Sequence, residues 1–167
     1  MSNLTLGQKV PEFSLQTTSN ETYSLEKDLE ERKGWHFIVF FRGAWCPVCI
    51  QDLKDIEESH SYFQGKNVSF TAISTDDLSN LRKLSDEHDF SFPILSDENL
   101  DVLRSYGVFY HDDTAPYEDH GSHGEAAYFL IDQSGNLLYQ QKQTSPFGRP
   151  NATELRKIVQ YIDKNLK

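Results

Sequence analysis

The chain has 167 residues, of which 37% are hydrophobic and 13% aromatic, and it carries 16 basic against 26 acidic residues. This length and composition predict one globular domain over residues 1–167 with a sizeable core, and they exclude a disordered chain. The formal net charge of −10 repels phosphate backbones and anionic membranes, so we expect neither nucleic acid nor a membrane as a partner.

The chain begins without the pattern of a targeting segment. Residues 1–6 show no basic region followed by an apolar stretch, and no apolar run in the sequence approaches the ~20 residues that a membrane helix requires. We therefore expect a cytoplasmic protein. Its acidic surface is compatible with an oligomer.

The first half of the chain alternates between strand and helix patterns. An uninterrupted apolar run at 37–41 predicts a strand covered on both faces, and apolar residues on one face of 46–63 predict an amphipathic helix. A β-rich segment at 68–73 and a helical pattern from 77 to about 88 follow. This alternation predicts parallel strands with right-handed crossovers. Acidic runs are predicted to be solvated helix faces at 26–31, 52–58 and 86–89.

The second half of the chain predicts a short helix, a hairpin and a closing helix. After a turn at Phe92-Pro93, residues 96–99 cap a short helix that ends at Gly107. Two apolar segments, 128–132 and 137–140, flank a turn and predict a β-hairpin. Asn151 caps a final helix with a continuous apolar face. This order predicts an α/β protein with a thioredoxin-like fold.

The chain's two cysteines, Cys46 and Cys49, lie between the predicted strand at 37–41 and the helix that follows it. At a helix N-terminus the unpaired N–H groups stabilise a thiolate, which lowers a cysteine pKa from about 8.5 towards ~3.5–7.5. In a reducing compartment this spacing favours a redox pair over a structural disulfide. A zinc site would need four ligands, and the sequence has no second Cys-x-x-Cys motif. We therefore expect no metal and no cofactor at the pair.

Five segments at residues 6–15, 41–49, 72–76, 92–97 and 128–135 together span nearly the whole chain. In this order they resemble peroxiredoxin-like proteins of the alkyl hydroperoxide reductase/thiol-specific antioxidant (AhpC/TSA) family. The resemblance implies a thioredoxin fold with a central mixed sheet flanked by helices and an added N-terminal β-hairpin. It also implies peroxide or disulfide chemistry at the thiols.

The chain departs from the family's peroxidase motif at several positions. The resemblance places Cys49 on the cysteine that attacks peroxide, Cys46 on a hydroxyl residue and Arg42 on a proline. Ala126 replaces the arginine that the family carries before its late strand, and thioredoxin-like reductases carry a cis-proline near the same point. We expect Arg42 or Arg149 to supply the missing guanidinium. The alternatives are a surface ion pair for Arg42 and a structural role for Arg149.

Three residues are predicted to form the surface that meets a substrate or partner, namely Trp45, Pro47 and Arg149. Thioredoxin-like proteins place a tryptophan at the position of Trp45, where it shields the thiols and offers apolar surface to a partner. Core packing is the alternative for this indole.

Two further groups of polar residues have structural explanations. Residues 111–124 contain three histidines and three aspartates, which predicts a solvated loop insertion. The alternatives for His111, His120, His123 and the aspartates are zinc binding and a pH-dependent loop. Asp76 and Asp77 stand at the start of a predicted helix, where we expect N-capping.

The sequence leaves three functions open. In the favoured one, the Cys49 thiolate attacks a hydroperoxide, becomes a sulfenic acid and condenses with Cys46 to a disulfide, which thioredoxin, glutaredoxin or glutathione reduces. In the second, Cys46 attacks a partner's disulfide and Cys49 resolves the mixed disulfide. In the third, the pair is a non-enzymatic redox sensor. The family resemblance favours the first function and the geometry of the motif favours the second.

Overall fold

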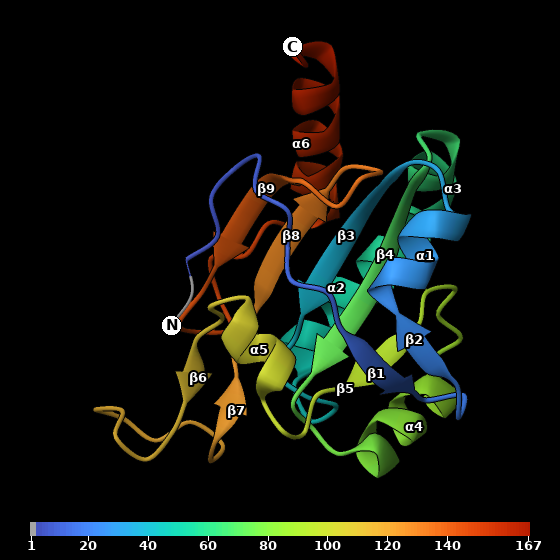
Figure 1. Ribbon diagram of the computed structural model, residues 1–167. Coiled ribbons are helices and arrows are strands. Elements are labelled where there is room, and N and C mark those ends of the chain that lie inside the picture. Colours follow the sequence, from blue (N-terminus) through green and yellow to red (C-terminus); the bar gives the residue numbers. More distant parts are fainter. Residues whose placement is uncertain (1–2) are drawn as a thin grey trace.

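The computed structural model describes residues 3–167, so the first two residues of the predicted 1–167 domain lie outside the described residues. A seven-stranded mixed sheet forms its centre, in the order β2-β1-β5-β4-β3-β8-β9 (Figure 1). The parallel strands are β3 (Trp35–Phe40), β4 (Val68–Ser74) and β5 (Ile94–Ser96). The predicted α/β class with a mixed central sheet is confirmed.

Antiparallel hairpins extend the parallel strands on both sides. Strand β8 (Ala127–Ile131) pairs with β3, and β9 (Leu137–Lys142) forms the outer edge, as the predicted hairpin required. On the other side, β1 (Ser14–Thr17) pairs with β5 and with β2 (Thr22–Ser24). The pair of β1 and β2 is the N-terminal β-hairpin that the resemblance implied.

Helices cover both faces of the sheet, because alternate residues of each central strand point to opposite sides. Ile38 and Phe40 pack in one apolar cluster with α1 (Leu25–Glu31) and α5 (Asp101–Ser105). Phe37 and Val39 face the opposite side. There they pack with the apolar faces of α2 (Pro47–Glu58), α3 (His60–Gly65) and α6 (Ala152–Lys164).

The two thiols belong to a third cluster at one end of the sheet. Cys46 and Cys49 pack there with Phe41 and with the buried leucines of α4 (Leu78–Glu87). The thiols therefore lie where β3 ends and α2 begins.

Two predicted elements differ from the structure. The helix expected at 46–63 is two helices, because the backbone of Ser59 leaves helical geometry (φ −93°, ψ 9°) between α2 and α3. Ile56 and Phe63 still pack in one cluster, so their seven-residue spacing hid the break. Strand β5 was missed, because only three residues form it after Phe92-Pro93.

The predicted helix caps are present. The Asn151 side chain accepts a hydrogen bond from the backbone N–H of Glu154 at 2.9 Å, and Asp77 accepts one from the N–H of Asn80 at 2.7 Å. Within the predicted capping segment of the short helix, Asp97 accepts hydrogen bonds from backbone N–H groups in α5. Polar residues thus cap α4 and α6 directly, whereas the N-cap position of α5 is Leu100 and Asp97 binds the first turn of that helix from outside it.

The insertion at 111–124 differs most from its prediction. Strands β6 (Tyr110–His111) and β7 (His123–Gly124) pair with each other and form a small sheet apart from the central one (Figure 1). His111 and His123 are only 2% and 3% exposed, so the prediction of a solvated loop is wrong for the two ends of the insertion. Between residues 3 and 167, no helix combines the length and apolar character needed to cross a membrane.

Candidate active site

Cys46 occupies the N-terminus of α2 because the local sequence starts the helix there. Its backbone is extended, and Pro47, which has no N–H to leave unpaired, takes the first helical position. The Cys46 Sγ accepts a hydrogen bond from the backbone N–H of Cys49 at 3.3 Å. Cys46 is therefore the capping residue of α2, and its sulfur replaces the oxygen that usually caps a helix.

Each sulfur of the pair lies beside a different arginine. The Nη1 of Arg42, in the loop after β3, is 3.8 Å from Cys46 Sγ. The Nη2 of Arg149, in the loop before α6, is 3.3 Å from Cys49 Sγ, which also accepts the backbone N–H of Arg42 at 3.4 Å. Both cysteines are free thiols and almost fully buried. Both arginines that were predicted to replace the missing guanidinium thus lie at the thiols.

The surroundings push the pKa values of the two thiols in opposite directions. The pKa of Cys46 is lowered to about 5, because its sulfur accepts hydrogen bonds from the Cys49 thiol, from the Cys49 backbone N–H and from Arg42. Burial raises the pKa of Cys49, and the hydrogen bond to Cys46 raises it further. The two sulfurs therefore share one proton, which resides on Cys49.

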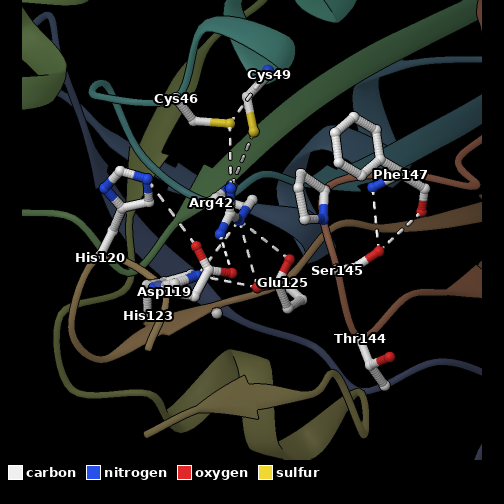
Figure 2. Close-up of polar contacts among 12 residues, drawn as sticks. Arg42, Cys46, Cys49, Asp119, His120, His123, Glu125, Thr144, Ser145 and Phe147 are labelled. Atoms are coloured by element: carbon white, nitrogen blue, oxygen red, sulfur yellow. Dashed lines mark hydrogen bonds and ion pairs between the residues drawn. The ribbon is translucent and has the colours of Figure 1, made fainter. Parts of the chain in front are cut away.

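Arg42 is held in a buried cluster of charged and imidazole groups (Figure 2). Its Nη2 forms an ion pair with Asp119 Oδ2 at 2.5 Å, and its Nε is 3.1 Å from Glu125 Oε1. The other oxygen of Glu125 lies 2.9 Å from His123 Nε2. Sequence analysis missed Glu125 and placed Asp119 in a solvated loop. The density of acidic and histidine residues between positions 111 and 125 was the available signal.

The indole of Trp45 lies between Arg42 and the insertion. Its ring is 4.9 Å from the Arg42 guanidinium carbon, and its centroid is 4.8 Å from that of His120 and 4.9 Å from that of His123. A side chain at Gly43 would overlap this indole, which explains the glycine. Trp45 remains 37% exposed, so part of the ring is available to a partner.

The other two residues of the predicted partner surface differ in exposure. Pro47 is exposed, whereas the Arg149 side chain is 7% exposed and pairs with Asp52 at 3.6 Å. Asp52 also accepts a short hydrogen bond from the Tyr128 hydroxyl, and burial raises the pKa of its carboxyl group. Arg149 therefore faces Cys49 and Asp52 more than it faces solvent.

A cavity of about 430 Å³ lies beside Arg149. Pro47 and Val48 form part of its wall, and Arg149 and Asp52 contribute polar groups to it. The Arg149 side chain therefore both lines this cavity and contacts Cys49 Sγ. The arrangement suits a polar group attached to an apolar body.

The cluster around Arg42 also contains the donor types of a metal site. Donor atoms of His111, Asp119 and Glu125 lie within 4.8 Å of one another. However, the Arg42 guanidinium is already paired with both carboxylates. A cation would have to displace this guanidinium from them.

The comparisons agree with the resemblance seen in the sequence. The model of the AhpC/TSA family matches residues 6–140. The thioredoxin-like protein YneN of Bacillus subtilis (strain 168) is 32% identical over 112 residues, which are 62% of this chain and 63% of that protein. The alkyl hydroperoxide reductase C of Buchnera aphidicola subsp. Acyrthosiphon pisum is 29% identical over 125 residues, 70% of this chain and 58% of that protein. The chain thus spans less than two thirds of either relative's length.

A solved structure with a similar fold is that of the peroxidoxin BcpB from Mycobacterium tuberculosis. It aligns with a TM-score of 0.78 and 19% sequence identity, over 98% of this chain and 99% of that one. At this identity the likeness establishes the fold, including the arrangement of the central sheet and its flanking helices.

Proposed function

Because the chain belongs to the AhpC/TSA family, we propose that it is a thiol-dependent redox enzyme that reduces hydroperoxides with Cys46 and Cys49. The position of Arg149 carries this proposal. Its guanidinium contacts Cys49 Sγ at 3.3 Å, and the same side chain lines the neighbouring cavity. There it can bind a peroxide oxygen and stabilise the negative charge that develops on the leaving oxygen. Arg149 would thus replace the guanidinium that is missing at Ala126.

In the first step Cys49 is the nucleophile and Cys46 is its base. The Cys49 proton passes to the Cys46 thiolate, and Cys49 sulfur attacks the terminal peroxide oxygen. The O–O bond breaks, Cys49 becomes a sulfenic acid, and the alkoxide takes the proton from Cys46 to leave as an alcohol. Arg149 and the backbone N–H of Arg42, which both donate to Cys49 Sγ, stabilise the transient Cys49 thiolate.

In the second step Cys46 is the nucleophile. Its thiolate attacks the sulfenic sulfur of Cys49, which forms the Cys46–Cys49 disulfide and releases hydroxide. The backbone N–H of Cys49 and the Arg42 guanidinium, which both donate to Cys46 Sγ, stabilise this thiolate. A protein dithiol, or two molecules of glutathione, then supplies the two electrons and two protons that restore the pair.

A second function is favoured by the same pKa difference. Cys46 is the better ionised of the two sulfurs, so it is suited to attack the disulfide of another protein, after which Cys49 would resolve the mixed disulfide. In that case Cys49→Ser would trap a mixed disulfide on Cys46. A redox sensor would form the disulfide without sustained turnover.

The reductant and the compartment are part of the proposal. The exposed surface of Trp45, Pro47 and Val48 borders the thiols and offers an apolar contact for thioredoxin or glutaredoxin, and glutathione is the small-molecule alternative. We place the enzyme in the cytoplasm, where these reductants would return the pair to the dithiol form.

The experiment is stopped-flow oxidation of the reduced protein by hydrogen peroxide and by an organic hydroperoxide, followed by mass spectrometry of the two cysteines. We expect one equivalent of either peroxide to yield the Cys46–Cys49 disulfide, and thioredoxin or glutathione to support repeated turnover. If the thiols stay free after a stoichiometric dose but exchange rapidly with a protein disulfide, the second function is correct.

A further inference from the structure

The Arg42 guanidinium has a different neighbour at each of its nitrogen atoms (Figure 2). The Nη1 faces Cys46 Sγ at 3.8 Å, the Nη2 faces Asp119 at 2.5 Å, and the Nε faces Glu125 at 3.1 Å. The two acidic residues come from separate positions: Asp119 lies in the loop between β6 and β7, and Glu125 lies between β7 and β8. Together they fix the plane of the guanidinium.

An arginine side chain does not hold such a position without partners. It loses rotamer entropy when it is fixed, and a single sulfur at 3.8 Å is a weak contact. Glu125 is completely buried, and its carboxylate would be costly to bury without a cation. The position of Arg42 beside Cys46 therefore depends on this pair of carboxylates.

We propose that Glu125 and Asp119 are positioning residues, which hold the Arg42 guanidinium against Cys46 Sγ and so stabilise the Cys46 thiolate. The inference deepens the proposed function, since this thiolate is the base and the resolving nucleophile there. Neither carboxylate contacts a sulfur among the hydrogen bonds and ion pairs of the described residues. Both act through Arg42.

If the carboxylates act through Arg42, removing one of them should shift the pKa of Cys46 in the direction opposite to the one that direct electrostatics predicts. Removing a negative charge near a thiol lowers its pKa by direct electrostatics. Releasing Arg42 from Cys46 has the opposite effect, because the thiolate loses a neighbouring cation. A substitution that abolishes the acceptor for Arg42 Nε should therefore raise the pKa of Cys46 although it removes an acidic residue.

Other charged groups around the pair must be kept constant in such a test. Cys46 faces Arg42 and the Cys49 thiol, and Cys49 faces Arg149. Arg42 also faces His123 Nε2 at 3.3 Å and the ring of Trp45. The comparison therefore needs two variants that remove the same charge and differ only in hydrogen bonding.

The variants Glu125→Gln and Glu125→Leu meet this requirement. Both remove the charge, but only glutamine keeps an oxygen that can accept from Arg42 Nε. The readout is the lower apparent pKa of the dithiol, measured by the ultraviolet absorbance of the thiolate, which requires no substrate. We expect Glu125→Leu to raise this pKa by about one unit and Glu125→Gln to leave it unchanged or lower it.

The Arg42→Gln background tests whether Glu125 acts through Arg42. In that background, Glu125→Leu and Glu125→Gln should give the same lower apparent pKa of the dithiol. Equal pKa values for the two variants in the presence of Arg42 would overturn the proposal, and so would a difference that persists without Arg42.

If Glu125→Leu does not fold, variants of Asp119 provide the same test. Its side chain is 15% exposed in a loop, so Asp119→Ala and Asp119→Asn should both fold. We expect the alanine variant to have the higher thiol pKa. Asp113→Ala, an exposed aspartate of the same loop, should match the wild type. A protein that does not react with peroxide would refute the proposed function, but these titrations would still decide the role of the carboxylates.

Discussion

The surroundings of Cys46 and Cys49 differ more than their proximity in sequence suggests. Cys46 lies at the start of α2, beside an arginine that two carboxylates hold in place. Cys49 lies inside the first turn of the same helix, beside an arginine that pairs with Asp52. Hydrogen bonds from the Cys49 thiol, the Cys49 backbone N–H and Arg42 lower the pKa of Cys46, whereas burial raises the pKa of Cys49. The comparison shows that a thiol's environment, more than its motif, determines which sulfur holds the proton.

The largest expected effect comes from removing Cys49. If Cys49 attacks the peroxide, Cys49→Ser should reduce peroxide consumption to the uncatalysed rate, although Cys46 remains beside Arg42. The measurement is peroxide consumption with a thiol reductant present. A Cys49→Ser protein that still consumes peroxide would reverse the roles that we assign to the two sulfurs.

Removing Arg149 should affect the reaction of Cys49 and leave Cys46 nearly unchanged. We expect Arg149→Met to slow oxidation of Cys49 by about 100-fold, the usual effect of losing one preorganised donor, with little change in the pKa of Cys46. Stopped-flow oxidation and thiolate titration measure the two quantities. Arg156→Met is the matched control, because Arg156 stacks on Tyr62. A rate for Arg149→Met equal to that of the control would exclude Arg149 from the reaction.

A buried histidine gives the protein a second pH dependence, which must be separated from that of the thiols. His36 lies in β3 between the hydroxyl groups of Ser69 and Thr71, and burial lowers its pKa to about 3. The unfolded state therefore binds a proton below about pH 6.5 while the folded state does not, so stability falls as the pH falls from 6.5 towards 3. We expect the free energy of unfolding to fall by about 2 kcal/mol between pH 7 and pH 5.

Urea unfolding at the two pH values measures this loss. His36→Gln should be less stable at pH 7 and should show a smaller change between the two conditions. An unchanged pH dependence in this variant would show that groups other than His36 cause the acid sensitivity.

The smallest expected effect is on the redox potential. We expect the Cys46–Cys49 disulfide to have a potential of roughly −180 to −270 mV, the range of thiol oxidoreductases. Arg42→Met should raise the pKa of Cys46 and make the potential more negative by about 30 mV for each pKa unit, because the reduced form loses stabilisation. Titration against glutathione measures it. A wild-type value below about −300 mV would indicate an inert structural bridge.

The sequence predicted the elements that depend on local residues. The run at 37–41, Cys46 before Pro47, and Asn151 at the last helix each have a local physical cause, and the structure contains the corresponding strand and helix starts. Strand β5 was missed because its three residues are too few to show a period. Its pairing with β4 and β1 defines it instead.

The candidate site was only partly predictable, because its contacts join distant parts of the chain. Arg42 and Glu125 are 83 positions apart, and Arg149 and Cys49 are 100 positions apart. The resemblance pointed to Arg42 and Arg149 by revealing that an arginine was missing. The resemblance gave no such signal for Glu125, and the density of acidic and histidine residues around it did not single it out before β7 and β8 bring it beside Arg42.

The most direct test of the account is the state of Cys49 in the Cys46→Ser variant after a stoichiometric dose of hydrogen peroxide. We predict that mass spectrometry will find Cys49 as a sulfenic acid that accumulates for want of a resolving thiol, whereas the wild type will contain the Cys46–Cys49 disulfide. A folded Cys46→Ser protein that keeps Cys49 as a free thiol after this treatment would contradict the account.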